Sequence, residues 1–417
     1  VGYCSTKHIQ NKQILLAQRE ALQHRGPDDL GVWWSNDLRI GLAHRRLAII
    51  DTSSYGHQPM LDESSRYCIT FNGEIYNYKS LRNYLKGKGH KFRSSSDTEV
   101  VLASFKEWGD SCVQHFNGMF SFGLYDKKRR RLFLARDRAG ENPLFYKLSS
   151  NEILFGSTLK ALLVNESIER HLDYESLDYL LAYGYIPGHR CILRGINKLP
   201  PAHALIFDID TGKTKIWQYW HLPDVVDSID INDGFKDEQI LLDELDSLLE
   251  DSVTRQLVAD VPVGILLSGG LDSSIITAMA SRSTNNFKTF TIRFPENRQY
   301  DETKHARLIA NYFQTEHIEL EATSSSVNLL PMLAKQFDEP IVDSSMIPTY
   351  LVCDLISQHC KVALGGDGGD ELFGGYKHYN RLVWLQQRLK YLPNSIKEII
   401  SGLAELVLPY GLKGRYW

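Results

Sequence analysis

The sequence lacks several features that would place it in a specialised class of protein. Its six cysteines are scattered without a C-x-x-C pair, which favours reduced thiols. No apolar run of about 18 residues and no secretory leader pattern occur, so the sequence predicts neither a membrane span nor export. The net charge is −4 with both signs interspersed, which predicts no nucleic-acid or membrane surface. A cytoplasmic location is the expectation.

Two regions of different pattern divide the 417 residues. Residues 1–220 are rich in short strand patterns and turns, and helical patterns interrupt them. Residues 221–238 are acidic and polar, as expected for a linker. From residue 239 onward, apolar strands alternate with amphipathic helices, which predicts a parallel, doubly wound sheet. The helices predicted in the first region are Asn11–Gln23, Tyr78–Lys88, Asp97–Trp108 and Tyr174–Tyr183.

A glycine-rich turn, Ser268–Ser274, joins a predicted strand at Val261–Leu267 to a predicted helix. Such a turn brings backbone N–H groups and a helix N-terminus toward an anion. Ser273 and Ser274 would either cap the helix or donate hydrogen bonds to phosphate oxygens. Asp272 would repel a bare phosphate, so its presence favours a Mg²⁺ ion between the two. No lysine precedes the serines, which excludes a Walker loop; an ordinary strand–helix turn is the alternative.

The second concentration of unusual residues is Gly365–Glu371, which follows a predicted strand and contains four glycines and three carboxylates. Clustered carboxylates repel each other unless a cation joins them. A Mg²⁺ ion shared by Asp272 and Asp370 would remove that repulsion, whereas a solvated acidic turn is the alternative. Ligands of doubly wound sheets bind at the carboxyl ends of the strands, where both glycine-rich segments are predicted to lie.

The N-terminal half contains a second group of candidate site residues. On a predicted strand at Gly41–Ile50, alternation places His44 and Arg46 on one face and Arg45 on the other. The pair Asn72-Gly73 suits either an oxyanion hole or a type I′ hairpin turn. Asp97 is compatible with a binding role, with the N-cap of the following helix, or with both.

Taken together, these motifs resemble those of glutamine-dependent asparagine synthetases of the bacterial B type, and the resemblance covers nearly the whole chain. The resemblance implies a class II amidotransferase domain with an N-terminal-nucleophile αββα sandwich (1–220), a linker (221–238) and an ATP-pyrophosphatase domain with a doubly wound parallel sheet (239–417). The motifs that carry it are His24–Asp29, His44–Ile49, Asn72–Asn77, Ser96–Glu99, Ser268–Ser274, Tyr300–Glu302, Phe337–Pro340, Asp343–Ser345 and Asp367–Tyr376.

The same resemblance implies a reaction. ATP with Mg²⁺ adenylates the side-chain carboxylate of aspartate, and ammonia released from glutamine displaces AMP to give asparagine. The family is commonly a homodimer. Two alternatives stay open: amidation of another carboxylate, such as a polysaccharide uronic acid, and a non-catalytic scaffold that binds nucleotide or glutamine.

The resemblance also assigns residues in the synthetase half. The adenosine would contact Leu267 and Ile292, and Gly366 would lie by the ribose or the α-phosphate. Mg²⁺ would be shared by Asp272 and Asp370, and Asp367 would accept a proton from ammonia, although relatives often have Glu there. The pyrophosphate would be held by Ser268, Gly269, Gly270, Asp272 and Ser273.

In the amidotransferase half, the family position selects Arg46 as the clamp for the glutamine α-carboxylate, the alternative being that both arginines are solvated. Asn72 and Gly73 would form the oxyanion hole, and Glu74 and Asp97 would bind the amino group. The family's nucleophilic Cys is expected three residues upstream of Val1, and its catalytic Lys is expected downstream of this sequence. The given polypeptide is thus expected to lack glutaminase activity that the encoded protein has.

Three further residues depart from the family's pattern. Cys4 is expected to be an ordinary strand residue, because its amine is part of a peptide bond and so cannot act as the base. Ala139 and Asn142 replace residues common in relatives on a hairpin expected to support the domain interface.

Overall fold

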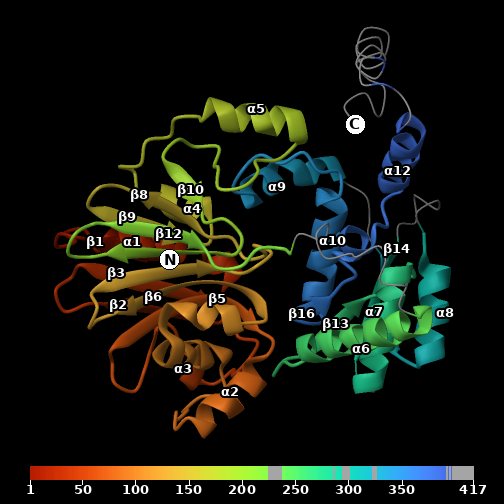
Figure 1. Cartoon of the computed structure of the whole chain (residues 1–417), viewed down its shortest axis with the longest axis horizontal. Helices are drawn as coiled ribbons and strands as arrows, with labels where there is room; N and C mark the ends of the chain where they lie inside the picture. Colours follow the sequence, from red (N-terminus) through yellow and green to blue (C-terminus); the bar gives the residue numbers. More distant parts are fainter. Residues whose placement is uncertain are drawn as a thin grey trace.

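Three β-sheets organise the part of the protein that the structure describes, two in its N-terminal half and one in its C-terminal half (Figure 1). The computed structural model describes residues 1–223, 237–284, 287–293, 301–321, 326–390, 393 and 396. Most of the predicted linker and Tyr300 lie outside the described residues.

The N-terminal half is a sandwich of two six-stranded antiparallel sheets. The first sheet has the order β10 (Ile196–Lys198), β8 (Phe145–Leu148), β9 (Glu152–Gly156), β1 (Gly2–Ser5), β3 (Ile40–Arg46) and β2 (Asp29–Trp34). The second has the order β12 (Thr214–Gln218), β11 (His203–Asp208), β7 (Arg131–Arg136), β6 (Gly118–Asp126), β5 (Tyr67–Ile75) and β4 (Met60–Leu61).

Helices cover both outer faces of this sandwich. On the second sheet, α2 (Tyr78–Gly87) and α3 (Asp97–Trp108) pack against β5 and β6 in a phenylalanine-rich core. On the first sheet lie α1 (Gln13–Glu20), α4 (Leu159–Leu163) and α5 (Tyr174–Tyr183). A third core, which includes Leu42, Leu134 and Phe207, fills the space between the sheets. This helix–sheet–sheet–helix layering is the αββα sandwich that the sequence predicted.

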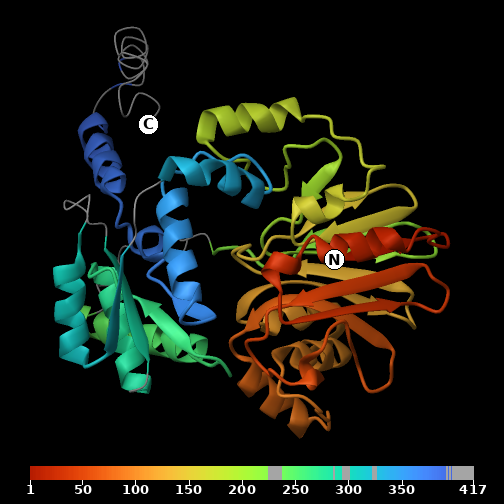
Figure 2. The same cartoon turned by 180° about the vertical axis from the view of Figure 1, so that it is seen from behind.

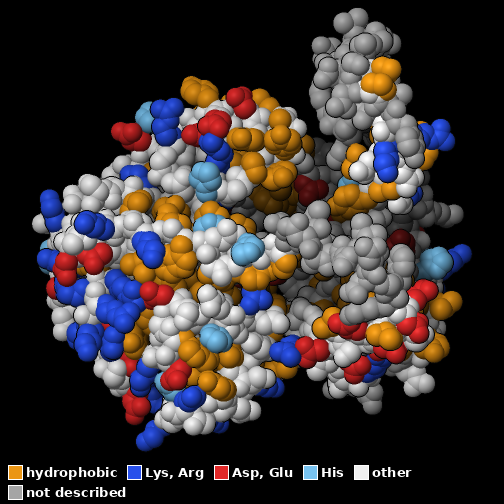
Figure 3. Space-filling view, viewed as in Figure 1, with side chains coloured by type: hydrophobic (Ala, Val, Ile, Leu, Met, Phe, Trp, Pro, Cys, Tyr) orange, Lys and Arg blue, Asp and Glu red, His pale blue; other side chains and the backbone are white. Residues whose placement is uncertain are grey.

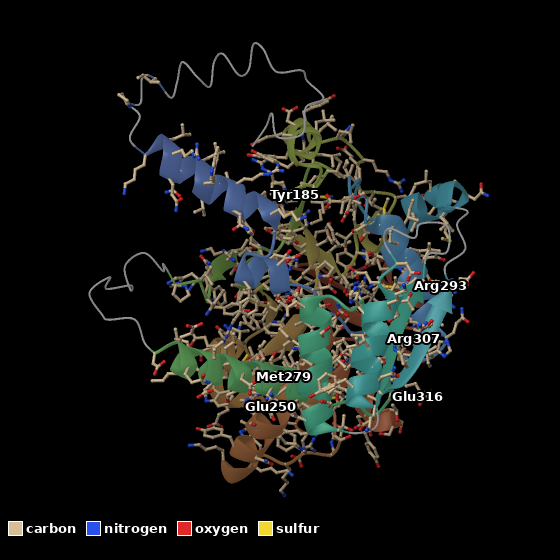
Figure 4. The ribbon with its side chains drawn as sticks, turned by 90° about the vertical axis from the view of Figure 1, so that its right-hand side faces the viewer. Tyr185, Glu250, Met279, Arg293, Arg307 and Glu316 are labelled. Atoms are coloured by element: carbon tan, nitrogen blue, oxygen red, sulfur yellow. The ribbon has the colours of Figure 1, made fainter. Side chains whose placement is uncertain are left out.

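The C-terminal half contains a four-stranded parallel sheet in the order β15 (Glu316–Glu321), β14 (Lys288–Arg293), β13 (Val263–Leu266) and β16 (Val362–Leu364). Apolar side chains of α6 (Glu238–Gln256) and α7 (Leu271–Ser283) cover one face, and those of α10 (Met346–Ser357) cover the other. The remaining described α-helices are α8 (Thr303–Phe313), α9 (Leu330–Gln336), α11 (Gly369–Phe373) and α12 (Lys377–Leu389). Figure 4 faces this half, with Met279 on α7 and Arg307 on α8 labelled.

The chain order of this sheet creates a switch point. Strands β13, β14 and β15 follow one another outward, whereas β16 returns to the opposite side of β13. The segments that leave β13 and β16 therefore start beside each other at the carboxyl edge, the usual ligand site of such sheets. Both predicted glycine-rich segments follow these two strands, as the sequence analysis expected.

Several element boundaries differ from the predictions. The strand expected at Gly41–Ile50 ends at Arg46, and the helix expected at Asn11–Gln23 spans only Gln13–Glu20. The basic residues Lys127, Lys128, Arg129 and Arg130 form the hairpin tip between β6 and β7. Among the described helices, none is long and apolar enough to cross a membrane.

Hydrogen bonds connect the two halves at several places, two of which are described next, and the views from both sides show the halves next to each other (Figures 1 and 2). The Asp338 carboxylate accepts hydrogen bonds from the backbone N–H groups of Leu159 (3.0 Å) and Lys160 (3.2 Å), at the start of α4. Asp260, just before β13, accepts from Asp51 N at 2.7 Å and donates from its own N–H to Ile49 O at 3.0 Å. Both contacts involve segments that lead to candidate site residues.

Candidate functional site

A cavity of about 370 Å³ opens between the two antiparallel sheets. It is lined by the residues that the sequence assigned to glutamine binding together with neighbours from β3, β6 and the loop after β7. Its polar lining includes His44, Arg46, Asn72, Glu74, Asp97, Ser121 and Asn142. The structure thus brings all five amidotransferase-half candidates, Arg46, Asn72, Gly73, Glu74 and Asp97, to one cavity.

Arg46 is the last residue of β3 and is buried at the cavity wall. Its Nη2 donates to the backbone oxygens of Ile50 (2.9 Å) and Asp51 (2.6 Å). These contacts require the chain to curl around the guanidinium after Arg46, which is why the predicted strand stops there. Arg45 faces the other way and pairs with Glu20. The alternative in which both arginines are solvated is therefore wrong.

His44 lies on the Arg46 face of β3 and is buried. Its Nδ1 is 3.0 Å from Thr70 Oγ1, and that hydroxyl donates to Ala43 O at 3.3 Å. With that hydroxyl proton directed at Ala43 O, Nδ1 acts as the donor to Thr70 Oγ1. Burial, with the positive charge of Arg46 among further causes, lowers the pKa of His44 to about 3. The sequence placed His44 on this face but assigned it no role.

Asn72 and Gly73 lie within β5, opposite Ser121 and Phe120 of β6. The predicted alternative of a type I′ hairpin turn is therefore wrong. Gly73 has a φ of +149°, and a Cβ there would lie 2.1 Å from Met119 O, so only glycine fits. Asn72 Nδ2 donates a hydrogen bond of 3.0 Å to Asn142 Oδ1.

Glu74 and Asp97 place two carboxyl groups in the cavity wall, and both are buried. Burial, reinforced by Asp97, raises the pKa of Glu74 to about 7, and burial raises the pKa of Asp97 to about 6. Asp97 Oδ2 accepts from Ile75 N at 3.0 Å, whereas Glu74 Oε1 has no partner among the described residues. The helix cap is Ser96, which accepts from Thr98 N, so the alternative assignment of Asp97 as N-cap is wrong. Two enclosed carboxylates suit a cationic amino group.

The turn after β13 has the geometry of an anion-binding loop. Helix α7 begins at Leu271 with Gly270 as N-cap, so the prediction that Ser273 or Ser274 caps it is wrong. Both hydroxyls lie in the first turn and donate back to Gly270 O, at 3.2 and 2.7 Å respectively. Ser268 Oγ lies 3.0 Å from Ser273 Oγ, so the hydroxyls gather at the helix N-terminus.

Gly269 allows this loop to pack under α8. Its φ is +85°, and a Cβ would lie 2.7 Å from Ala306 N and from His305 Cβ. Leu267 is buried against Ala306 and Ala310, so its side chain is part of the core here. Ile292 lies on β14 in register with Leu320. The expected contacts of Leu267 and Ile292 with adenosine stay predictions.

The two glycine-rich segments meet at Asp272. A Cβ added to Gly369 would lie 2.7 Å from Asp272 Cγ, and one added to Gly366 would lie 2.9 Å from Asp272 Cβ. A Cβ on Gly375 would overlap Asp370 Oδ1, so a glycine also makes room for that carboxylate. Within the described part of the chain, neither aspartate forms an ion pair, and no group of three or more His, Cys, Asp or Glu side chains is gathered for a metal. The two carboxylates nevertheless supply the kind of oxygen ligand that Mg²⁺ takes together with waters and phosphate oxygens.

Two other sequence expectations concern Cys4 and the Phe337–Pro340 motif. Cys4 is fully buried in β1, and burial raises the pKa of its thiol well above its usual range, as expected for a strand residue without chemistry. The motif was counted with the synthetase half, but Asp338 and Glu339 contact the amidotransferase half. Nothing in sequence spacing revealed this, because the contact joins residues about 150 to 180 positions apart.

Comparisons with known proteins assign a family to each half of the chain. The family described as glutamine amidotransferase domain matches residues 1–220, and the family described as asparagine synthase matches residues 244–415. "Putative asparagine synthetase (glutamine-hydrolyzing) 2" of Methanocaldococcus jannaschii is 35% identical, covering 95% of this chain and 80% of its own length.

Two Bacillus subtilis proteins named glutamine-hydrolyzing asparagine synthetase extend this comparison. Number 3 is 36% identical, covering 96% of this chain and 69% of its own length. Number 1 is 32% identical, covering 97% of this chain and 62% of its own length. The chain belongs to the glutamine-hydrolyzing asparagine synthetase family, a family of ATP-dependent amide ligases.

Proposed function

We propose that this protein synthesises asparagine from aspartate, ATP and glutamine, with one site in each half. The observation that carries the proposal is the pairing of two sites in one chain: a cavity whose lining includes Arg46 and the carboxyl groups of Glu74 and Asp97, and a glycine-rich loop against Asp272. The first suits an α-amino acid, and the second suits pyrophosphate. The comparisons favour aspartate as the acceptor over a uronic acid, and they favour an enzyme over a scaffold.

Glutamine would bind in the cavity by its charged groups. The guanidinium of Arg46 would hold the α-carboxylate, and the carboxylates of Glu74 and Asp97 would hold the ammonium group. Asn72 Nδ2 and the Gly73 N–H would stabilise the oxyanion that forms when the side-chain amide is attacked, which is worth roughly 3–4 kcal/mol per donor in comparable sites. Cys4 has no part in this step, because its thiol is buried outside the cavity lining.

ATP would bind at the switch point of the parallel sheet. The loop Ser268–Ser273 would hold the pyrophosphate through its N–H groups and hydroxyls, with Gly366 beside the ribose or α-phosphate. Mg²⁺, held by Asp272 and Asp370, would neutralise charge on the phosphates. Asp367, exposed on the loop after β16, would accept the proton that ammonia loses when it attacks the activated carboxylate.

The proposal includes a cytoplasmic homodimer, the assembly and location implied by the family resemblance. Exposed apolar side chains gather over α5 on the amidotransferase half (Figure 3), where Tyr174, Leu181 and Tyr183 are each more than 60% exposed. Exposed apolar area of this kind supports an association surface.

The test of the proposed function is the transfer of nitrogen. The full-length gene product is incubated with aspartate, Mg²⁺-ATP and glutamine labelled with ¹⁵N at the side-chain amide, with excess unlabelled ammonium as competitor. The proposal predicts that the label enters the asparagine amide. Labelled ammonium in solution with unlabelled asparagine would contradict internal transfer, and the absence of asparagine would contradict the whole proposal.

A further inference from the structure

We infer that Asn142 is a positioning residue for glutamine hydrolysis, acting through Asn72; the inference rests on the proposed glutaminase function. Asn142 Oδ1 accepts a 3.0 Å hydrogen bond from Asn72 Nδ2, and both residues line the cavity. From the sequence, Asn142 is expected on a hairpin that supports the domain interface. The structure corrects this placement, because the side chain lies beside the proposed oxyanion hole.

Hydrogen bonds hold both the backbone N–H and the backbone oxygen of Asn142. Asn142 N donates to Asp137 Oδ2 at 3.0 Å, and Arg136 Nε donates to Asn142 O at 2.8 Å. Asp137 is fully buried, and the same Oδ2 also accepts from Phe120 N at 3.1 Å. Since Phe120 is the strand partner of Gly73, Asp137 ties Asn142 to the part of the sheet that presents the second oxyanion donor.

The observed contact directs the NH₂ of the Asn72 carboxamide toward Asn142 Oδ1. The terminal torsion of an asparagine side chain is broad, so rotation exchanges its NH₂ and its oxygen easily. Asn142 Oδ1 can accept only from the NH₂, which holds that group in place and leaves its second hydrogen free. Without Asn142, the carboxamide oxygen could face the developing oxyanion and repel it.

The unpaired amide nitrogen of Asn142 is a second reason to expect that this residue acts when a ligand is bound. Its Nδ2 is buried and has no partner among the described residues. A buried unpaired donor costs free energy, so an asparagine kept only for packing would be a poor choice at this position. An apolar side chain of similar size would fill the same space without that cost.

The test is a double-mutant cycle in the full-length gene product, with glutamate formation from glutamine as the assay. Asn142→Leu keeps the side-chain volume and removes the acceptor, and Asn142→Ala removes it without adding bulk. We expect either change to lower kcat about tenfold with KM for glutamine within about twofold, because the contact acts in the transition state. In an Asn72→Ala background, the same changes should have no further effect.

Asn36→Leu is the matched control, since Asn36 is exposed and lies outside the cavity; its kcat should equal that of the wild type. Near-ultraviolet circular dichroism verifies that each variant is folded. Additive losses in the double variants would mean that Asn142 contacts the substrate directly and would overturn the inference, as would an unchanged kcat in both single variants. No hydrolysis by the wild type, or no loss in Asn72→Ala, would instead contradict the proposed function of the site.

Discussion

Lys198 Nζ lies 2.7 Å from Glu339 Oε2, and this ion pair joins the amidotransferase half to the segment between α9 and α10. Glu339 Oε1 also accepts from Ile192 N at 2.7 Å, and both side chains of the pair are 14% exposed. Together with the neighbouring Asp338, this contact fixes a synthetase segment against α4 and the strand β10.

We expect Glu339→Gln to lower the free energy of unfolding by about 1–3 kcal/mol, because the ammonium of Lys198 loses its charged partner in a partly desolvated place. Urea titration measures this change. The matched control is Glu316→Gln, which breaks an exposed ion pair with Lys288 (2.8 Å) and should cost at most about 0.5 kcal/mol (Glu316 is labelled in Figure 4). Equal effects of the two changes would show that the Lys198–Glu339 pair does not stabilise the contact.

The raised pKa of Glu74 should make both the stability of the fold and the binding of glutamine depend on pH. Its pKa is raised from 4.5 to about 7 in the folded protein, so the folded state binds more protons than the unfolded state between those values. Stability from this group is therefore lost as pH rises through that range. We expect Glu74→Gln to be more stable than the wild type at about pH 8, with little difference at about pH 4, when melting is followed across pH.

The same pKa governs glutamine binding. Glu74 must be ionised to hold the ammonium group, so kcat/KM for glutamine should fall as pH drops below about 7. Glu74→Gln should raise KM strongly and abolish this step in the profile. A wild-type profile that is flat between about pH 6 and pH 8 would contradict the assignment of Glu74.

Asp260 should influence glutamine binding from the other half of the chain. Its carboxylate holds Asp51 N, and the backbone oxygens of Ile50 and Asp51 hold Arg46. Asp260→Ala leaves Asp51 N without its acceptor, so the loop around Arg46 loosens. We expect a several-fold higher KM for glutamine, with asparagine synthesis from ammonium unchanged. An equal loss with both nitrogen sources would indicate a general effect on the fold instead.

Two neighbouring glycines of the anion-binding loop should respond differently to alanine. Gly269→Ala meets Ala306 N at 2.7 Å and a φ of +85°, so it should cost about 2–4 kcal/mol of stability. Gly270 has a φ of −71°, and its nearest obstacle is the movable Ser268 Oγ at 3.2 Å. Gly270→Ala should therefore cost less than about 1 kcal/mol, and a reversed order in chemical denaturation would contradict the loop geometry.

The sequence was informative where the pattern is local. Helices α3 and α5 have the predicted bounds, because apolar spacing and the caps at Ser96 and Gly184 are features of adjacent residues. The two glycine-rich segments were placed correctly at the carboxyl edge of the sheet, because strand–helix alternation fixes that edge.

The sequence did not predict the features that depend on contacts between residues far apart in the chain. Asn72-Gly73 favours a turn in isolation, yet pairing with β6 keeps it extended. The strand before Arg46 ended early because the guanidinium binds the next carbonyls. The contact between Asn142 and Asn72, and those of Asp338 and Glu339, join segments that no local pattern connects.

The most direct test of the central claim uses ammonium, which bypasses glutamine hydrolysis. Pyrophosphate release by the full-length gene product is measured with Mg²⁺-ATP and ammonium, with and without aspartate, alongside Asp272→Asn. The account predicts release that requires aspartate, one asparagine per pyrophosphate, and loss of both in Asp272→Asn. Pyrophosphate release that does not depend on aspartate, or aspartate-dependent release without asparagine, would contradict it.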